Sequence, residues 1–339
     1  MPDNRLRLFP VLAAVLAVFA VAQPVHADEI AVSAHPVTTF HIGSSDPVVG
    51  RLRFVGGLEL SAADKRFGGL SGLRLSGDGG RLYAVSDDAN WFTAELVRDS
   101  AGRLSGLGPV SVGCLCRQDS TRYGSKHWGD SEGLEVDGDT AYVSFERLNR
   151  INRYDLGRDH LPGRPVQATA SFKRLNIGYN KGLEAMALAP SKGGSAGSSI
   201  AGRFVAIAEE SLNAAGNNRA FIADDRAIEE FAITRSDAYS PTDAAFLPDG
   251  DLLVLERRFG FAVGLGMRIR RFAVGDIRPG AVLSGEVLAE ADLSSRIDNM
   301  EGIAAWRDGE GRTRIALVSD DNFNKRLQRT LLLEFVLDE

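Results

Sequence analysis

The sequence predicts an all-β fold, a β-propeller of five blades, and three observations carry this prediction. A short unit recurs five times along the chain. Each unit contains a turn rich in Gly, Asp or Pro between two β-type runs, and Asp-Gly between apolar runs is a strong hairpin signal. Glycine fills 37 of the 339 positions, against about 7% in ordinary proteins, as expected for a fold with many tight turns. Six blades remain the alternative if residues 257–292 contain a further sheet.

The five units are recognised by their openings, of which Asp130-Ser-Glu-Gly-Leu-Glu135 and Asn299-Met-Glu-Gly-Ile-Ala304 are examples. Fixed spacing of this kind indicates a repeat architecture. Four-stranded units at such intervals are typical of propeller blades. The marker residues of the openings lie 61, 52, 59 and 58 residues apart and are Ser71, Glu132, Glu184, Asp243 and Glu301.

The two ends of the domain are predicted to meet in one blade. The last unit stops after residues 331–337, one strand short, and residues 49–60 form a β-type run before the first marker. Pairing the two would close the ring and cover an exposed edge. We therefore expect a propeller domain over residues 49–339, preceded by an irregular lead over residues 28–48.

Residues 1–27 are predicted to be a signal peptide. Arg5 and Arg7 precede an apolar run over residues 8–22, and small residues follow at the expected cleavage site. No later segment is apolar enough over about 20 residues to span a membrane. The sequence thus predicts an exported protein, periplasmic or secreted, that is not an integral membrane protein.

The net charge limits the classes of partner, and the two cysteines raise the question of a disulfide. The formal net charge of −6 argues against nucleic acid, which usually needs a dense basic face. Cys114 and Cys116 lie one residue apart, and an oxidising compartment would permit a disulfide. The favoured interpretation is nevertheless two unpaired cysteines on one face of a strand, because so short a bridge constrains almost no chain entropy.

The repeats also predict a site where acidic residues converge. The inner strands of a propeller line a central channel, so equivalent positions gather at one mouth. The unit openings would bring Glu132, Glu184, Asp243 and Glu301 there. The ends of the second strands would add eight further carboxylates, of which six are expected metal ligands: Asp87, Asp88, Glu146, Glu209, Asp320 and Asp321.

Such a cluster needs cations, because unpaired carboxylates repel one another. Carboxylate oxygen is the ligand that Ca²⁺ prefers, so Ca²⁺ is the expected cofactor. Basic residues are interleaved with the acids and are expected to hold an anionic, possibly phosphorylated, small substrate: Lys181, Arg147, Arg257 and Lys325. The competing interpretation is that these acids are solvated turn residues or tie blades together by pairing with arginine.

Gly129-Asp-Ser-Glu-Gly133 matches the Gly-x-Ser-x-Gly pattern of a serine-hydrolase nucleophile elbow. That motif requires a strand–turn–helix, whereas residues 134–146 are predicted to form two strands. Histidine is also scarce, with only five in the sequence. We therefore favour neither a serine triad nor a histidine-rich metal site.

The openings that begin at Asp130, Lys181 and Asn299, together with the Ser-Asp-Asp strand ends, resemble the exported bacterial family labelled "esterase-like activity of phytase". The resemblance extends over residues 49–339. It implies a propeller-like fold and hydrolysis of phosphate esters, with Glu132, Glu184 and Glu301 as the catalytic positions, joined by Asp320 and Asp321. Two other functions remain open: a non-catalytic propeller that binds a ligand or protein, and a lactonase-like propeller with a single metal ion.

Overall fold

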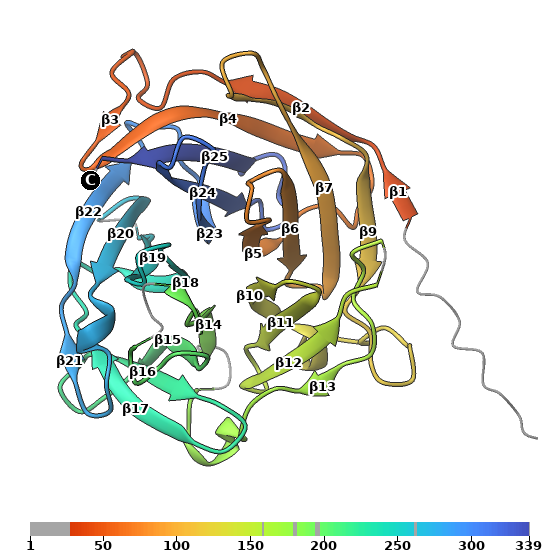
Figure 1. Cartoon of the computed structure of the whole chain (residues 1–339). Helices are drawn as coiled ribbons and strands as arrows, with labels where there is room; N and C mark the ends of the chain where they lie inside the picture. The colour runs from red at the N-terminus through yellow and green to blue at the C-terminus, as the bar shows by residue number, and fades with distance from the viewer. Residues whose placement is uncertain (1–27, 158, 179–181, 194–196, 261–262, 339) are drawn as a thin grey trace, which may run out of the picture.

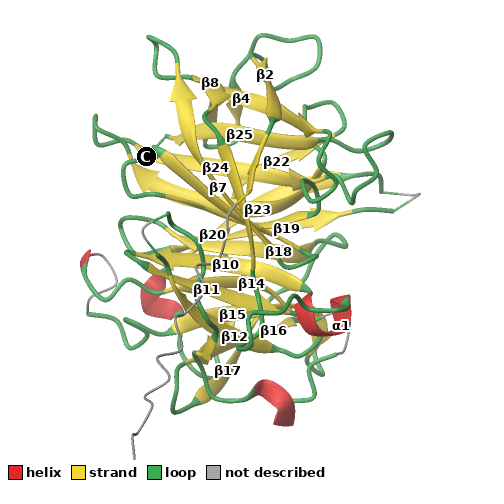
Figure 2. Cartoon of the chain, turned by 90° about the vertical axis from the view of Figure 1, so that its right-hand side faces the viewer, coloured by secondary structure: helices red, strands yellow, loops and turns green. Residues whose placement is uncertain are grey.

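The computed structural model describes residues 28–157, 159–178, 182–193, 197–260 and 263–338. Five sheets, antiparallel but for one parallel strand pair, are arranged in a ring around a central channel, which confirms the five-bladed propeller (Figure 1). Seen from the side, most strands run roughly along the direction of the channel, from one face of the ring to the other (Figure 2). The signal peptide predicted over residues 1–27 lies outside the described residues.

Each of the first three blades has an inner strand on the channel and further strands toward the outside. Short segments rich in Val, Ile, Leu and aromatic residues form them, because such side chains fit a pleated surface packed on both sides. Blade 1 consists of β5 (Leu70–Leu75), β6 (Arg81–Ser86), β7 (Asn90–Arg98), β9 (Val110–Cys114) and β1 (Asp28–Ile30), with β8 (Leu104–Leu107) beside β7. Blade 2 consists of β10 (Ser131–Asp137), β11 (Thr140–Phe145), β12 (Arg150–Asp155) and β13 (Val166–Gln167). Blade 3 consists of β14 (Leu183–Leu188), β15 (Phe204–Leu212), β16 (Asn218–Ala223), β17 (Ile228–Ile233) and β21 (Val282–Leu283).

The last two blades follow the same plan. Blade 4 consists of β18 (Ser240–Phe246), β19 (Leu252–Arg258), β20 (Gly266–Phe272) and β22 (Glu286–Asp292). Blade 5 consists of β23 (Asn299–Arg307), β24 (Thr313–Asp320), β25 (Thr330–Leu337), β4 (Leu52–Ala62) and β2 (Val32–Val37), with β3 (Val48–Val49) beside β4. Residues 257–292 thus complete blades 3 and 4 and contain no sixth sheet among the described residues.

The N-terminal strand closes the ring as the sequence predicts. β4 pairs with the last strand of the chain, with Leu60 opposite Thr330 and Leu52 opposite Leu337. The prediction of an irregular lead over residues 28–48 is wrong. β2 adds to the outer edge of β4, and β1 pairs with β9 of blade 1, so this segment joins the first and last blades from outside. β2 covers an edge, and none of its residues is fully buried.

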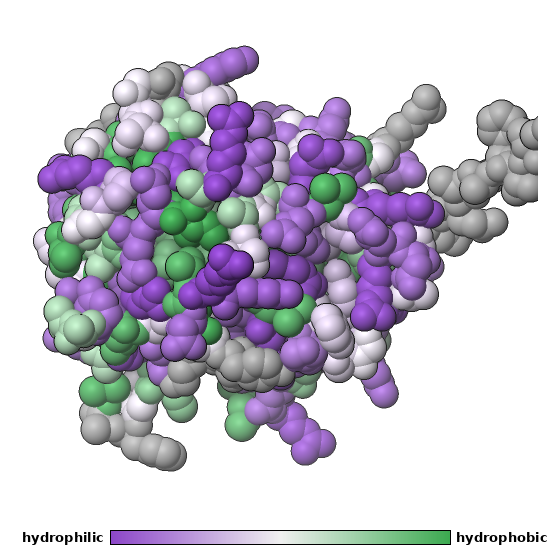
Figure 3. All heavy atoms as spheres, turned by 90° about the horizontal axis from the view of Figure 1, so that it is seen from below, coloured by the Kyte–Doolittle hydropathy of each residue, from purple (hydrophilic) through white to green (hydrophobic). Residues whose placement is uncertain are grey.

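Helices are short and lie between strands: α1 (Lys126–Gly129), η1 (Phe172–Arg174) and η3 (Val274–Asp276). None of the helices in the described part of the chain has the length and apolar character needed to cross a bilayer. Buried apolar side chains pack between neighbouring blades, for example Met267 and Ile269 of blade 4 in one cluster with Leu317 of blade 5. On the outer side of the ring, seen from below, hydrophilic side chains surround small apolar groups (Figure 3).

Candidate functional site

The inner strand of every blade has a β-bulge near its beginning. The register shifts between Leu70 and Gly72 in β5, and equivalent shifts occur in β10, β14, β18 and β23. A bulge adds an unpaired residue and re-aims its side chain, and bulges are frequent next to functional sites. The residues carried by the five bulges are Ser71, Glu132, Glu184, Thr242 and Glu301.

Four of these five bulge residues line one cavity of about 250 Å³ at the end of the channel, which we call the mouth. All of its lining side chains are charged or polar. The full lining is Ser71, Asp87, Lys126, Asp130, Glu132, Glu146, Arg147, Glu184, Glu209, Arg257, Glu301, Asp320 and Asn322.

The mouth gathers most of the residues that the repeat pattern selected. All three predicted catalytic glutamates line it, with four of the predicted metal ligands and two of the predicted substrate-binding arginines. Sequence reasoning missed Asp130, Lys126 and Asn322. The signal for Asp130 was its place directly before β10, but Lys126 belongs to the loop between blades 1 and 2, which has no counterpart in the repeat.

Carboxylate oxygens in the mouth are close enough to share a cation. Asp130, Glu132 and Glu146 each offer an oxygen within 4.8 Å of the others. Glu146, Glu184 and Glu209 form a second group with the same property. Glu146 belongs to both groups and is itself buried, so it lies at the centre of the cluster. A donor set made only of carboxylate oxygens suits a hard cation such as Ca²⁺.

Burial raises the pKa values of the glutamates in the mouth. It is the largest cause for Glu132 and Glu184, whose pKa values stand well above the ordinary range, and neighbouring carboxylates raise them further. Burial also raises the pKa of Glu146 to about 7. The pKa values of Glu301 and Asp320 rise to about 7 and about 8 for the same leading reason. Without a cation, this cluster therefore retains protons near neutral pH.

Three basic side chains neutralise part of the cluster. Arg257 Nε lies 2.8 Å from Glu301 Oε1, and its Nη2 lies 3.4 Å from Glu209 Oε1. Arg147 Nε donates to Asp130 Oδ2 at 2.6 Å. The ammonium of Lys126, at the start of α1, contacts Asp87. The mouth thus combines an excess of acid with cations that an anionic ligand could contact.

Asp243 does not lie at the position that the repeat pattern predicts. The bulge of β18 carries Thr242, so Asp243 is one residue out of register with the glutamates of the other blades. A shift of one residue turns a strand side chain to the other direction. Asp243 is completely buried below the mouth, where its Oδ2 accepts a hydrogen bond from Arg74 at 3.1 Å.

Three other predicted site residues, among those the structure describes, are also outside the lining of the mouth. Asp321 is buried, and its Oδ1 accepts the backbone N–H groups of Gly69 and Phe323 at 3.1 and 3.0 Å. Asp88 is exposed and lines a neighbouring cavity. Lys325 donates to the carbonyl of Ala62 at 2.8 Å. Lys181 lies outside the described residues.

Ser131 is not exposed on a nucleophile elbow. It begins strand β10, and β10 continues into a hairpin with β11 rather than into a helix. Its side chain is completely buried, and its hydroxyl donates to the carbonyl of Ser86 at 2.5 Å. The Gly-x-Ser-x-Gly match is thus part of a blade opening.

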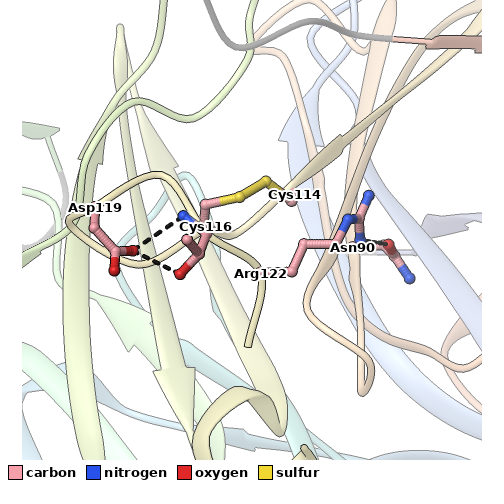
Figure 4. The surroundings of a disulfide bond; sticks show 6 residues. Asn90, Cys114, Cys116, Asp119 and Arg122 are labelled. Carbon is pink, nitrogen blue, oxygen red and sulfur yellow. Dashed lines mark hydrogen bonds between the residues drawn. A yellow bond between two sulfur atoms is a disulfide. The ribbon is translucent and has the colours of Figure 1, made fainter. Parts of the chain in front are cut away.

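Cys114 and Cys116 form a disulfide, which corrects the favoured prediction of two unpaired cysteines (Figure 4). β9 ends at Cys114, so the chain leaves the extended conformation there and the two Cα atoms lie 5.1 Å apart. That separation is within the range that disulfides bridge. The bond stands at the start of the loop that leads to α1, and Arg122 in this loop donates to Asn90 Oδ1 of β7 at 2.9 Å.

Fold and mouth together define a five-bladed propeller with an acidic cavity at one end of its channel. The chain belongs to the Phytase-like family, described as "esterase-like activity of phytase", whose model matches residues 65–323. This match confirms the resemblance seen in the blade openings.

No curated protein matches the sequence. Among solved structures, the chain is similar to the PQQ-bound aldose sugar dehydrogenase of Streptomyces coelicolor, with 13% identity and a TM-score of 0.41 over 86% of this chain and 99% of that one. It is also similar to a luciferin-regenerating enzyme, with 10% identity and a TM-score of 0.39 over 81% of this chain and 95% of that one. Both likenesses are distant and say nothing about the chemistry of the mouth.

Proposed function

We propose that the protein is an exported, metal-dependent phosphoric ester hydrolase that acts at the mouth on a small anionic substrate. The observation that carries this proposal is the convergence of Glu132, Glu146 and Glu184 with Arg257 in one cavity. Membership of a family described by the esterase-like activity of phytase supports the reaction class.

The carboxylates of the mouth would hold the cation, with Ca²⁺ the expected ion. The two groups that share Glu146 are the sites that fit it best, because their oxygens lie within 4.8 Å of one another. Their chemistry matches as well, since hard cations take several carboxylate oxygens. When bound, such a cation neutralises phosphate oxygens and lowers the pKa of a coordinated water.

Basic residues at the mouth would orient the substrate. Arg257 and Arg147 each present a guanidinium that already faces a carboxylate, and a phosphate can compete for its remaining N–H donors. Lys126 adds a third positive charge at the side of the cavity. These three residues would bind the anionic group before the ester bond breaks.

Glu301 is the residue we propose as general base. Its pKa is about 7, and a base with a pKa near the working pH combines availability with proton affinity. It would take a proton from the attacking water as the new phosphorus–oxygen bond forms. The bond to the leaving oxygen would break, and that oxygen would take a proton from solvent water. Glu132 and Glu184, whose pKa values burial raises well above the ordinary range, would act as ligands once a cation has displaced their protons.

The test is hydrolysis of p-nitrophenyl phosphate and of phytate by chelator-treated protein, with and without added Ca²⁺. We expect turnover that requires the cation and falls at least a hundredfold in Glu301→Gln. A control variant is Glu310→Gln, whose side chain is 73% exposed on a surface turn. Absence of metal-dependent turnover on both substrates rejects the hydrolase. Cation binding without turnover would then identify a binding propeller, and turnover of a lactone panel alone would identify a lactonase.

Export is part of the same proposal. The basic and apolar residues of the first 27 positions support it, and a disulfide between Cys114 and Cys116 fits an oxidising compartment. Cell fractionation of the full-length chain tests it, with the processed protein expected in the periplasm or the medium. Unprocessed protein in the cytoplasm would contradict it.

A further inference from the structure

Arg74, on β5, connects the inner strands of the propeller directly below the mouth. Its side chain is only 6% exposed. It has contacts with every blade, and four of them are to backbone carbonyls. Nη1 donates to the carbonyls of Leu73 (2.5 Å) and Ile303 (2.8 Å) and to Asp243 Oδ2 (3.1 Å), Nη2 donates to the carbonyls of Met186 (2.9 Å) and Ala244 (2.6 Å), and Nε lies 3.3 Å from Glu135 Oε1.

The four carbonyls occupy equivalent positions in their blades. Each belongs to the second residue after a bulge, as Met186 follows Glu184 and Ile303 follows Glu301. An inner strand presents an unpaired edge to the channel, and buried carbonyls on such an edge need donors. A guanidinium has five N–H donors in a rigid plane, so one side chain can serve several strands at once.

Blade 2 joins the same network through a side chain instead of a carbonyl. Glu135 lies three residues after Glu132, and its second oxygen accepts the backbone N–H of Leu188 in blade 3 at 3.2 Å. Asp243 links the other side, since its Oδ2 also accepts the N–H of Ile303 in blade 5 at 2.9 Å. The positive charge of Arg74 is thereby paired with two carboxylates inside the channel.

We propose that Arg74 is the positioning residue of the mouth: it fixes the separation of the inner strands and so the size of the cation that Glu132 and Glu184 help to hold. This inference rests on the cation-binding part of the proposed function. The distance along the chain is short, because the residues that Arg74 contacts in blades 2, 3 and 5 are two or three positions from Glu132, Glu184 and Glu301. A change in strand separation therefore reaches the ligand oxygens with little room for compensation.

Cation size is the property that such a residue would control. Ca²⁺ accepts six to eight oxygens at 2.3–2.6 Å, whereas Mg²⁺ requires a tighter octahedron at 2.0–2.1 Å. A mouth held at one width discriminates between these ions, and a mouth with movable strands adapts to both. Loss of Arg74 is expected to lower the affinity for Ca²⁺ and to reduce the ratio of Ca²⁺ to Mg²⁺ affinity.

The experiment compares Arg74→Lys and Arg74→Met with Arg314→Met. Arg314 is a matched control, because it is also a buried arginine whose Nη2 pairs with a buried glutamate, Glu334, at 3.0 Å, but it lies outside the mouth. Ca²⁺ and Mg²⁺ affinities are measured by calorimetry, and melting temperatures report stability. We expect Ca²⁺ affinity to fall at least tenfold in Arg74→Met and less in Arg74→Lys, with a smaller Ca²⁺/Mg²⁺ ratio in both. Arg314→Met should lose stability with wild-type affinities.

Two results would overturn the inference: folded Arg74 variants with wild-type Ca²⁺ affinity and ion ratio, or the same loss in Arg314→Met. If Arg74→Met does not fold, Arg74→Lys and Asp243→Asn are compared with the wild-type protein instead.

If the wild-type protein binds no Ca²⁺, the proposed function fails. Hydrogen exchange then tests the remaining structural claim, since Arg74→Lys should accelerate exchange in β14, β18 and β23 together. Acceleration confined to β5 would contradict it.

Discussion

Arg257 Nε lies 2.8 Å from Glu301 Oε1 inside the mouth. The same guanidinium reaches Glu209 at 3.4 Å, so a single arginine from blade 4 faces acids of blades 3 and 5. Arg257 also lowers the pKa of Glu301 against the effect of burial, which leaves that pKa at about 7. The pair thus places a cation and a proton acceptor side by side at the proposed reaction site.

Replacement of Arg257 by Met should weaken the binding of an anionic substrate. Hydrogen bonds to charged groups contribute about 1.5–3 kcal/mol, so KM for p-nitrophenyl phosphate should rise by about tenfold or more. Ca²⁺ affinity should stay the same or increase, because a positive charge leaves the cluster. Steady-state kinetics measures KM, and calorimetry measures the Ca²⁺ affinity. Arg226→Met, at a side chain that is 89% exposed, is the control. An unchanged KM would exclude Arg257 from substrate binding.

Glu146 belongs to both carboxylate groups, so Glu146→Gln should lower Ca²⁺ affinity more than Asp130→Asn or Glu209→Gln, each of which affects one group. The expected order follows from the number of cation positions that lose a ligand. A Ca²⁺ titration of the three variants measures it. Equal losses in all three would show that the cation lies elsewhere in the mouth.

The stability of the metal-free protein should fall as pH rises. Glu146 and Glu301 have pKa values of about 7 and Asp320 about 8, all above the ordinary values, so the folded state binds more protons than the unfolded state from about pH 4 to 8. The free energy of unfolding therefore decreases through this window. We expect a melting temperature several degrees lower at pH 8.5 than at pH 5 in the presence of a chelator.

Addition of Ca²⁺ should reduce the difference in melting temperature between pH 5 and pH 8.5. The cation replaces the protons and binds the ionised cluster more strongly at pH 8.5 than at pH 5. Differential scanning fluorimetry across the pH series checks both effects. A melting temperature that rises steadily with pH in chelator would contradict the proton uptake inferred for the mouth.

Asp321 should be a stability residue and not a metal ligand. Asp321→Ala leaves the N–H groups of Gly69 and Phe323 without their acceptor. The Gly69 donor is buried, and a buried donor left unpaired costs about 1–3 kcal/mol. Urea unfolding should show this loss, while Ca²⁺ affinity stays near the wild-type value. Asp88→Asn, at an exposed neighbour of the mouth, should change stability by less than about 0.5 kcal/mol. A large loss of Ca²⁺ affinity in Asp321→Ala would show that Asp321 is a metal ligand.

The repeat pattern could predict the ring because hairpin turns and blade openings are local features of the sequence. It also predicted Glu132, Glu184 and Glu301 correctly as neighbours, since equivalent positions on the inner strands must converge at one end of the channel. In the fourth unit, the position predicted from the repeat pattern was wrong by one residue. Only the pairing of β18 with β19 reveals that Thr242 occupies the bulge, and the acid beside it made Asp243 the more attractive marker.

Other parts of the site depended on contacts between distant segments. Asp320 and Asp321 are adjacent acids at one strand end, but Asp321 is used by Gly69 in another blade, whereas Asp320 lines the mouth. Arg74 has no counterpart among the unit markers. Its role follows from three carbonyls of other blades that meet it only in the closed ring, so no pattern within one unit could indicate it.

Anomalous diffraction from crystals soaked with Ca²⁺ tests the central claim most directly, because it locates the ion. We predict density coordinated by Glu146 together with Asp130 and Glu132 or with Glu184 and Glu209. A mouth that contains no ion at millimolar Ca²⁺, in crystals whose ligand oxygens are free of lattice contacts, would contradict the account.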